Sequence, residues 1–369
     1  MVGRRQFMAS LGGGLITQAY RAVGARQSGE EGEPFFRTRG VVLTPEDLTL
    51  EDWPERAKSA GLTTIALHDG RSARNVVRFV QSPQGARFLA KCRKLGLAVE
   101  YELHAMSDLL PRDLFRKNPR LFRMNEKGER VPDKNLCVHS PEALEIAGEN
   151  ALELATLLPP TSSRYFFWGD DAAPWCRCPK CVTLSDSDQA LIVNNHLQKA
   201  IRARDPQARL AHLAYANTLQ PPKVVKPASG VFLEFAPINR RYDVPFEQAG
   251  HLDNQRHLAA LDANLAVFGS EGAQALEYWL DVSRFSHYQK PAQKLPFYPQ
   301  AFAADLTTYS SRGIRHITSF AVYIDADYVH MHGAPPLDVY GSQLRQWHAG
   351  HRAPNQARSG RITRPRFWV

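Results

Sequence analysis

The stretch RYFFWGDDAAPWCRCPKC, residues 164–181, carries the main evidence for the fold. An apolar aromatic run ends in two adjacent carboxylates, Asp170 and Asp171, and three cysteines follow with the spacing C-x-C-x-x-C. An aromatic strand that ends in acids and leads into such a loop is typical of a parallel barrel, whose reactive groups lie at the carboxyl ends of the strands. The stretch therefore predicts a strand whose end reaches a functional site.

Apolar runs and segments of helical period alternate on both sides of this strand. The apolar runs cover 40–44, 63–69, 98–104, 164–171, 209–217, 230–238, 274–281 and 316–325. The helical segments cover 50–60, 73–95, 141–158, 186–204, 254–268, 299–312 and 336–347. Eight strands that alternate with helices predict an α/β fold, a single (β/α)8 TIM-type barrel, with a doubly wound open sheet as the alternative.

Two connections depart from the regular alternation. The fifth crossover, 218–229, is rich in proline and shows no helical pattern. The third loop, 104–138, is long, polar and basic, with interleaved phenylalanines. Because long loops inside a compact domain are commonly functional, we expect this one to form an ordered lid over the site.

The positive charge of the chain is concentrated at its two ends. The net charge is +9, but residues 1–25 hold three arginines without an acid and residues 351–369 hold five, which leaves +1 for the body. A nucleic-acid partner is therefore not expected, and no apolar run approaches the roughly 20 residues that span a bilayer. Arg4 and Arg5 precede a weakly apolar, glycine-rich stretch, which predicts a twin-arginine-type signal peptide over 1–25 and export to the periplasm or beyond. A linker over 26–36, the barrel over 37–350 and a basic tail over 351–369 complete the expected organisation.

The predicted strand ends are rich in carboxylates, histidine, asparagine and aromatic side chains, and poor in lysine and arginine. Phosphoryl transfer requires basic residues or a glycine-rich phosphate loop, which these ends lack. Paired carboxylates among aromatic side chains are instead used to cleave glycosides, one as the acid and one as a nucleophile or stabiliser. The candidate residues are His68, Asp69, His104, Trp168, Asp170, Asp171, Tyr215, Asn217, Glu234, Glu277, Trp279, Tyr323 and Asp325.

Several of these residues also have a purely structural interpretation. The adjacent acids of the fourth strand could cap the turn that follows. Glu234 lies inside the apolar run VFLEFAP, and because an unpaired carboxylate is costly to bury, it needs either a buried partner or a polar site. Glu277, Trp279 and Asp281 are two positions apart, so a continuous strand would place them in a row on one face.

The cysteines allow two interpretations. Cys176, Cys178 and Cys181 lie within six positions, and Cys137 ends the third loop. These four can share one tetrahedral structural zinc ion, or they can form two disulfides in an exported protein. Either arrangement would join the third loop to the fourth, whereas Cys92 is expected to be a buried free thiol.

Three segments carry a resemblance to a known family: CRCPKC (176–181), NNHLQKAIRARDPQARLAHLAYANTLQPPKVVKP (194–227) and HAMSDLLPRDLFRKNPRLFRMNEKGERVPDKNLCVHSPE (104–142). They resemble proteins of the domain of unknown function 4838 family, which are similar to glycoside hydrolase family 163, a group of endo-β-N-acetylglucosaminidases that act on N-glycans. The resemblance covers residues 40–347. It implies a (β/α)8 barrel, a glycan substrate and a retaining mechanism assisted by the 2-acetamido group of that substrate, with no cofactor needed for catalysis.

The resemblance also implies roles for the adjacent acids. Asp170 would orient the acetamide and Asp171 would act as general acid and base. Because neighbouring residues on a strand face opposite sides, both can reach one sugar only if the backbone bends, and Gly169 permits such a bend.

Four functions remain open from the sequence. The first is an exported glycoside hydrolase that cleaves a glycan containing a 2-acetamido sugar with assistance from the substrate. The second is a retaining hydrolase with Asp171 as the acid and Glu277 as the nucleophile. The third is a barrel that binds glycans without catalysis. The fourth is a hydrolase whose metal ion is held by His68, Asp69, His104 and Asp170.

Overall fold

The computed structural model describes residues 33–348, which form a closed barrel of parallel strands in the order β1 to β8. The strands are β1 (Thr38–Leu43), β2 (Thr64–Leu67), β3 (Ala98–His104), β4 (Arg164–Trp168), β5 (Arg209–Ala214), β6 (Val231–Phe235), β7 (Gln274–Glu277) and β8 (His316–Phe320). β1 pairs with β8 and closes the sheet, with Gly40 opposite Thr318. The predicted (β/α)8 barrel is confirmed, and the open-sheet alternative is wrong.

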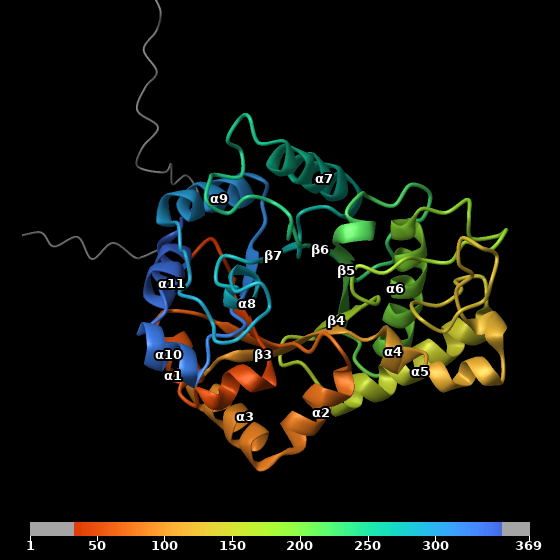
Figure 1. Ribbon diagram of the computed structural model, residues 1–369, viewed down its shortest axis with the longest axis horizontal. Coiled ribbons are helices and arrows are strands. Elements are labelled where there is room, and N and C mark those ends of the chain that lie inside the picture. Colours follow the sequence, from red (N-terminus) through yellow and green to blue (C-terminus); the bar gives the residue numbers. More distant parts are fainter. Residues whose placement is uncertain (1–32, 349–369) are drawn as a thin grey trace, which may run out of the picture. The chain divides into compact units, whose positions relative to one another are not determined.

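Helices surround the strands and separate most of them along the chain (Figure 1). The α-helices are α1 (Trp53–Ser59), α2 (Ala73–Gln81), α3 (Pro83–Leu95), α4 (Met106–Leu109), α5 (Pro141–Leu157), α6 (Asp186–Arg202), α7 (Leu252–Phe268), α8 (Val282–Phe285), α9 (Pro299–Ser311), α10 (Ala326–His332) and α11 (Leu337–Gln346). Short 3-10 helices are η1 (Pro45–Thr49), η2 (Arg112–Arg116), η3 (Pro119–Leu121) and η4 (Ala216–Thr218).

The single helix predicted over 73–95 is in fact two helices, α2 and α3. Ser82 lies between them in an extended conformation, with ψ 160°, because a residue that precedes proline avoids the helical region. Pro83 then occupies the first turn of α3, and the Ser82 hydroxyl accepts a hydrogen bond from the Gly85 N–H at 3.1 Å. Capping and the proline therefore break a helical pattern that is continuous in the sequence.

The crossover from β5 to β6 has no α-helix, as its composition predicts. A buried carboxylate orders it instead. Oδ1 of Asp188, near the start of α6, accepts hydrogen bonds at 2.9 Å from the main-chain N–H groups of Lys223, Val224 and Val225. These bonds satisfy backbone donors that a helix would otherwise have paired.

The interior of the barrel holds a layer of polar side chains. Gln274 of β7 donates from Nε2 to Oε1 of Glu102 and Oε1 of Glu234, each at 3.1 Å, and lies 3.1 Å from Oγ1 of Thr318. Arg164 of β4 donates to the amide oxygen of Gln274 at 2.7 Å. Burial raises the pKa of Glu102 well above its usual value and raises that of Glu234 to about 8. The two glutamates are therefore held in an environment that favours their protonated forms.

The boundaries of the barrel differ slightly from those expected. Phe36, which falls in the predicted linker, is fully buried, and its ring lies 6.2 Å from that of Trp347. The predicted signal peptide over 1–25 and the predicted basic tail over 351–369 lie outside the described residues. Within 33–348, no helix combines the length and the apolar character needed to cross a membrane.

Candidate active site

A cleft with a cavity volume of about 300 Å³ lies at the carboxyl ends of the strands. Its walls are largely aromatic and polar, and they come from the segments that follow seven of the eight strands. The lining residues are Thr44, His68, Gly70, Asp171, Tyr215, Ile238, Tyr278, Asp281, Ser283, Tyr288, Phe320, Val322 and Tyr323. None of them belongs to the loop 105–138, so the predicted lid flanks the cleft instead of covering it.

Asp171 presents its carboxylate to this cleft. It follows β4, and 56% of its side chain is exposed. The Tyr215 hydroxyl, from the end of β5, donates a hydrogen bond to Oδ1 of Asp171 at 3.0 Å. Nε2 of His104, at the end of β3, lies 3.6 Å from the same oxygen. Three neighbouring strand ends thus place a base, an acid and a hydroxyl donor in contact.

The two histidines of the site are held as neutral rings. Nδ1 of His104 lies 2.7 Å from the Gly169 carbonyl, and Nδ1 of His68 lies 2.7 Å from the Glu102 carbonyl. Because a carbonyl only accepts hydrogen bonds, each Nδ1 carries the proton and each Nε2 carries the lone pair. Burial lowers the pKa of His68 to about 4 and also lowers that of His104. The lone pair of His104 Nε2 therefore faces the Asp171 carboxyl group across 3.6 Å, which is longer than a hydrogen bond.

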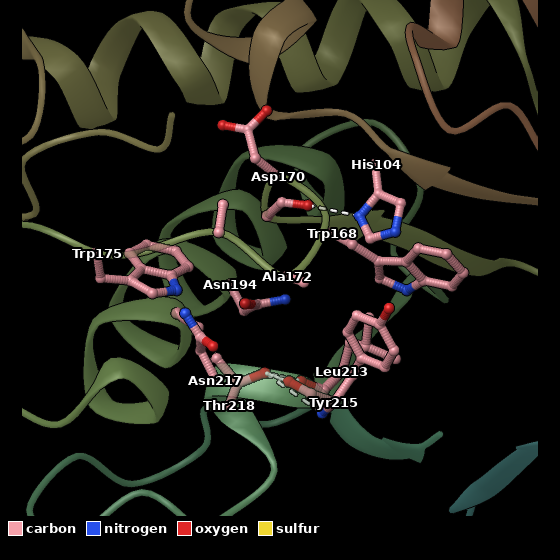
Figure 2. A pocket seen from close by; sticks show the side chains of 13 residues that line it. His104, Trp168, Asp170, Ala172, Trp175, Asn194, Leu213, Tyr215, Asn217 and Thr218 are labelled. Carbon is pink, nitrogen blue, oxygen red and sulfur yellow. Dashed lines mark hydrogen bonds between the residues drawn. The ribbon is translucent and has the colours of Figure 1, made fainter. Parts of the chain in front are cut away.

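Asp170 does not line this cleft; it belongs to a second, smaller pocket, where its carboxylate points away from the other side chains (Figure 2). Its Oδ2 accepts hydrogen bonds from Nη2 of Arg112 at 2.6 Å and from the main-chain N–H of Asn135 at 2.5 Å. The Asp170 N–H in turn donates to Oδ1 of Asn135 at 3.0 Å. Asp170 therefore joins the loop 105–138 to the end of β4 and does not share a pocket with Asp171.

Gly169 is required for close packing, whereas the sequence suggested a bend that brings both acids together. A Cβ at Gly169 would lie 3.0 Å from Oδ1 of Asn135 and 3.1 Å from Cζ2 of Trp175. The turn itself comes later, at Ala172, whose φ of 43° lies in the left-handed region. The backbone thus turns after the acidic pair, and the two side chains keep their opposite directions.

Asp281 is a second carboxylate of the cleft, and it lies at the amino end of α8. Its Oδ1 accepts hydrogen bonds from Oγ of Ser283 at 2.6 Å and from the Arg284 N–H at 3.3 Å. Oδ2 forms no hydrogen bond with the described residues, although only 4% of the residue is exposed. Burial raises the pKa of Asp281 to about 6.

Glu277 and Trp279 do not share a face with Asp281, contrary to the expected row. β7 ends at Glu277, so alternation stops there. Gln274 faces the interior of the barrel, and Glu277, three positions later, faces the outer layer of helices. There it forms a fully buried ion pair with Arg240, 3.1 Å apart, and accepts a hydrogen bond from the Tyr309 hydroxyl.

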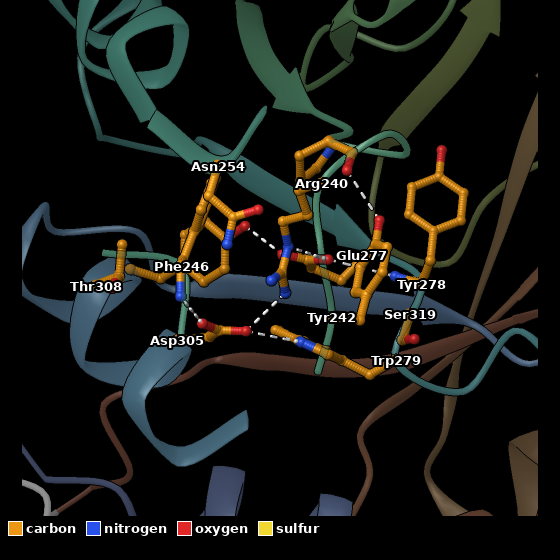
Figure 3. A network of polar contacts seen from close by, with 12 residues as sticks. Arg240, Tyr242, Phe246, Asn254, Glu277, Tyr278, Trp279, Asp305, Thr308 and Ser319 are labelled. Carbon is orange, nitrogen blue, oxygen red and sulfur yellow. Dashed lines mark hydrogen bonds and ion pairs between the residues drawn. The ribbon is translucent and has the colours of Figure 1, made fainter. Parts of the chain in front are cut away.

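The same outer network includes Asp305 of α9 (Figure 3). Nη2 of Arg240 lies 2.6 Å from Oδ2 of Asp305, and Trp279 donates from Nε1 to the same oxygen at 3.0 Å. Burial raises the pKa of Glu277 to about 7, and Arg240 opposes that rise. Glu277 is enclosed by protein partners and is not available as a nucleophile opposite Asp171.

Trp168 and Glu234 lie beneath the cleft, not in its wall. Both are buried, and Trp168 donates from Nε1 to Oε2 of Glu234 at 2.7 Å. Trp168 and Asn217 line a separate, smaller pocket between the ends of β4 and β5, which also reaches Tyr215 (Figure 2). Glu234 thus has the buried partners that its apolar surroundings require.

The remaining acids predicted for the site have structural partners: Asp69 orders the turn before α2, and Asp325 is the N-cap of α10. Oδ1 of Asp69 accepts hydrogen bonds from the Arg71 and Ser72 N–H groups that precede α2. Asp325 caps α10 and forms an ion pair with Lys290 at 2.5 Å. Tyr323 does line the cleft, with a φ of 70°.

The predicted metal site of His68, Asp69, His104 and Asp170 is not formed. Within residues 33–348, the cysteines 137, 176, 178 and 181 are the one group of three or more potential ligands whose atoms lie close enough to share an ion. All four cysteines are buried and none forms a disulfide. Among the described residues, His68, Asp69, His104 and Asp170 therefore do not form a group whose ligand atoms could share one ion.

The candidate set did not include Tyr288 and Phe320, and it also left out Tyr278 and Asp281, although both follow Glu277 at the same predicted strand end. Of these residues, only Asp281 had a signal in the sequence. It follows a predicted strand and lies two positions before Ser283, and an acid in such a position is typical of a helix cap. Tyr288 lies in the left-handed region, with φ 57°, and reaches the cleft from an irregular loop that no periodic pattern predicts.

The fold and the site define a protein of the (β/α)8-barrel class, with its polar cleft at the carboxyl ends of the strands. Residues 73–323 match the model of the family described as Domain of unknown function (DUF4838), so the chain belongs to this family. The sequence matches none of the curated proteins with which it was compared.

Two solved structures are similar to the chain. A β-N-acetylhexosaminidase from Bacteroides fragilis NCTC 9343 has 11% identity and a TM-score of 0.53, covering 87% of this chain and 67% of that one. A β-galactosidase from Rahnella sp. R3 has 12% identity and a TM-score of 0.50, covering 84% of this chain and 57% of that one. At these identities the likeness shows the barrel fold.

Proposed function

We propose that the protein is a glycoside hydrolase in which Asp171 is the general acid and base: it donates a proton to the glycosidic oxygen as the bond breaks. The observation that carries the proposal is the position of this carboxylate: it lies in the cleft between the Tyr215 hydroxyl and Nε2 of His104. Aromatic rings line the same cleft and can stack on sugar rings, as glycan-binding sites commonly require. A glycan is accordingly the proposed partner.

His104 and Tyr215 suit Asp171 to both halves of an acid–base cycle. The lone pair on His104 Nε2 faces the carboxyl group 3.6 Å away, so a small approach of the two side chains would let it accept a hydrogen bond from protonated Asp171 until the leaving oxygen takes the proton. Once the proton has left, the Tyr215 hydroxyl stabilises the carboxylate through its hydrogen bond to Oδ1. The same carboxylate can then accept a proton from the attacking water.

We further propose that the substrate contains a 2-acetamido sugar whose acetamide oxygen attacks the anomeric carbon. The sequence resembles glycoside hydrolase family 163, and one structural neighbour is a β-N-acetylhexosaminidase. Asp281 suits the orienting role that the resemblance gave to Asp170, because it lines the cleft and its carboxyl group is ionised above pH about 6. In that role Asp281 would accept a hydrogen bond from the acetamide N–H and stabilise the positive charge of the cyclised intermediate.

The competing mechanism within the same class uses Asp281 as a direct nucleophile. Its support is that Asp171 and Asp281 line one cleft. The two mechanisms differ in what they demand of the sugar: a direct nucleophile acts on sugars with or without an acetamide, whereas acetamide assistance requires that group.

The test measures hydrolysis of aryl 2-acetamido-2-deoxyglycosides and of the matching aryl glycosides that lack the acetamide. We expect cleavage of the first set only, and inhibition by a thiazoline analogue of the cyclised acetamide. Asp171→Asn should lower kcat/KM by about 10²–10⁴ for a poor leaving group, and by much less for dinitrophenolate, which leaves without protonation.

Asp170→Asn is the matched control, because it changes the adjacent carboxylate that does not line the cleft. We expect a loss below about tenfold for this variant, equal for both leaving groups. Full activity of Asp171→Asn on every substrate would contradict the assignment. Binding of glycans by the wild type without any cleavage would favour the non-catalytic barrel.

A further inference from the structure

Four cysteines from two separate loops meet at a buried point beside the acidic pair. Cys137 ends the loop 105–138, and Cys176, Cys178 and Cys181 belong to the loop between β4 and α6. All four Sγ atoms lie within 4.8 Å of one another. We propose that these cysteines bind one zinc ion, which joins the two loops. This proposal does not depend on the glycosidase function.

The distances between the sulfur atoms fit a shared ion and not a bond. Cys137 Sγ lies 3.9 Å from Sγ of Cys178 and 3.9 Å from Sγ of Cys181. A zinc ion with four sulfur ligands at about 2.3 Å requires tetrahedron edges of about 3.8 Å. A disulfide requires sulfur atoms about 2.05 Å apart. A multi-iron cluster places its thiolates on different irons and therefore farther apart than the ligands of one ion.

The surroundings of the sulfur atoms fit the charge of a tetrathiolate site. The Met124 N–H donates to Sγ of Cys176 at 3.3 Å, and Nη1 of Arg130 lies 3.7 Å from the same atom. Nδ1 of His139 lies 3.2 Å from Sγ of Cys181. Zinc with four thiolates carries a net charge of −2, and N–H donors to sulfur are the partners that stabilise such a charge in a buried place.

The ion would determine the shape of the region around the acidic pair. Asn135, two positions before Cys137, forms the reciprocal hydrogen bonds with Asp170, and Asp171 follows directly. The zinc ion therefore fixes the loop whose Asn135 holds the end of β4. Because a buried metal that links distant segments stabilises only the folded state, its loss should both lower stability and loosen this turn.

The test begins with the metal content of the full-length protein. We expect close to one zinc per chain by inductively coupled plasma mass spectrometry, and all five cysteines alkylated as free thiols after denaturation without reductant. Protein reconstituted with cobalt should show the thiolate charge-transfer and visible bands of a tetrahedral tetrathiolate ion. These readouts use the wild type, so they hold even where a variant does not fold.

Variants then locate the site. Cys178→Ser and Cys181→Ser should lose zinc and melt several degrees lower, whereas Cys92→Ser should keep both the zinc and the cobalt spectrum. Cys92 is the matched control, because it is also a buried free thiol but lies on α3. Two disulfides in the denatured wild type, iron in place of zinc, or metal-free protein with an unchanged melting temperature after chelation would each overturn the proposal.

Discussion

At the scale of single residues, the partners of a carboxylate decide its role. Asp170 and Asp171 are adjacent in the sequence, but Asp170 is held by Arg112 and Asn135 while Asp171 opens to the cleft. Asp281, which was not among the candidate residues, lines the cleft and has a raised pKa, as carboxyl groups at functional sites commonly do. Chemical type and position along the strand were not enough to separate these cases.

The pKa of Asp281 predicts a pH dependence. Burial raises this pKa to about 6, so the carboxylate that the mechanism requires is lost as the pH falls below that value. We expect kcat/KM on an acetamido glycoside to decrease about tenfold per pH unit below pH about 6. Initial rates from pH 4 to 8 measure the profile.

The variant Asp281→Asn should lower kcat/KM at pH 7 by about 10²-fold or more and remove that acidic limb. Asp253→Asn, which changes an exposed acid of α7, is the control and should retain the wild-type profile. An acidic limb that persists unchanged in Asp281→Asn would assign it to another group.

At the scale of elements, the point at which a strand ends decides which side chains reach the cleft. A continuous strand would have placed Glu277, Trp279 and Asp281 together, but β7 stops at Glu277 and the chain turns. Glu277 and Trp279 then join Arg240 and Asp305 in the outer network, and Asp281 reaches the cleft as a helix cap (Figure 3). The alternating pattern of residues 274–281 continues in the sequence beyond Glu277, the last residue of β7, so the pattern alone predicted a longer strand than the sheet contains.

The outer network predicts that Glu277 stabilises the fold without taking part in catalysis. In Glu277→Gln, Arg240 keeps Asp305 but loses half of its buried countercharge. We expect the free energy of unfolding to fall by about 3 kcal/mol, as for other broken buried ion pairs. Urea denaturation measures the loss, while kcat/KM at a temperature where the variant is folded should change by less than about threefold.

Glu271→Gln is the matched control, because Glu271 is exposed just before β7 and should change stability by less than about 0.5 kcal/mol. The opposite result for Glu277→Gln, a folded and stable protein without activity, would restore the pair of Asp171 and Glu277 as the mechanism.

At the scale of the whole molecule, the barrel combines a polar interior with a polar and aromatic cleft at the carboxyl ends of its strands. Glu102, Glu234, Arg164 and Gln274 come from four different strands and meet inside the barrel. Hydrogen bonds join these side chains to one another, but Oε2 of Glu102 is buried without a hydrogen-bond partner. Ionisation of this layer is therefore unfavourable in the folded protein.

This layer predicts how stability depends on pH. Burial raises the pKa of both glutamates, so the folded state binds more protons than the unfolded state and the free energy of unfolding decreases as the pH rises. We expect this decrease to begin near pH 4.5, the ordinary pKa of glutamate, and to continue through about pH 8, where Glu234 is half ionised in the folded state. Glu102→Gln should weaken the dependence, and urea denaturation at several pH values measures it.

Glu149→Gln, an exposed change on α5, serves as the control and should follow the wild type at every pH. If Glu102→Gln loses stability equally at all pH values, the cause is lost packing and not lost ionisation.

The sequence by itself determined the order and approximate bounds of the eight strands and most of the helices, and through them the barrel. This was possible because the signals for strands and helices are local: the spacing of apolar residues, the helix caps and the terminal glycines all involve residues close together along the chain. It also determined the family, from segments around CRCPKC. The twin-arginine signal over 1–25, and with it export, stays a prediction of the sequence.

Only the tertiary structure decided which candidates share the cleft. Asp171, His104 and Tyr215 come together because three strand ends meet at one face, whereas Asp170 and Glu277 are held by partners 32 or more positions away. It also brought Cys137 to the other three cysteines. Contacts between distant segments leave no periodic signal in the sequence, because each partner is compatible with many local patterns and its position depends on how the whole barrel closes.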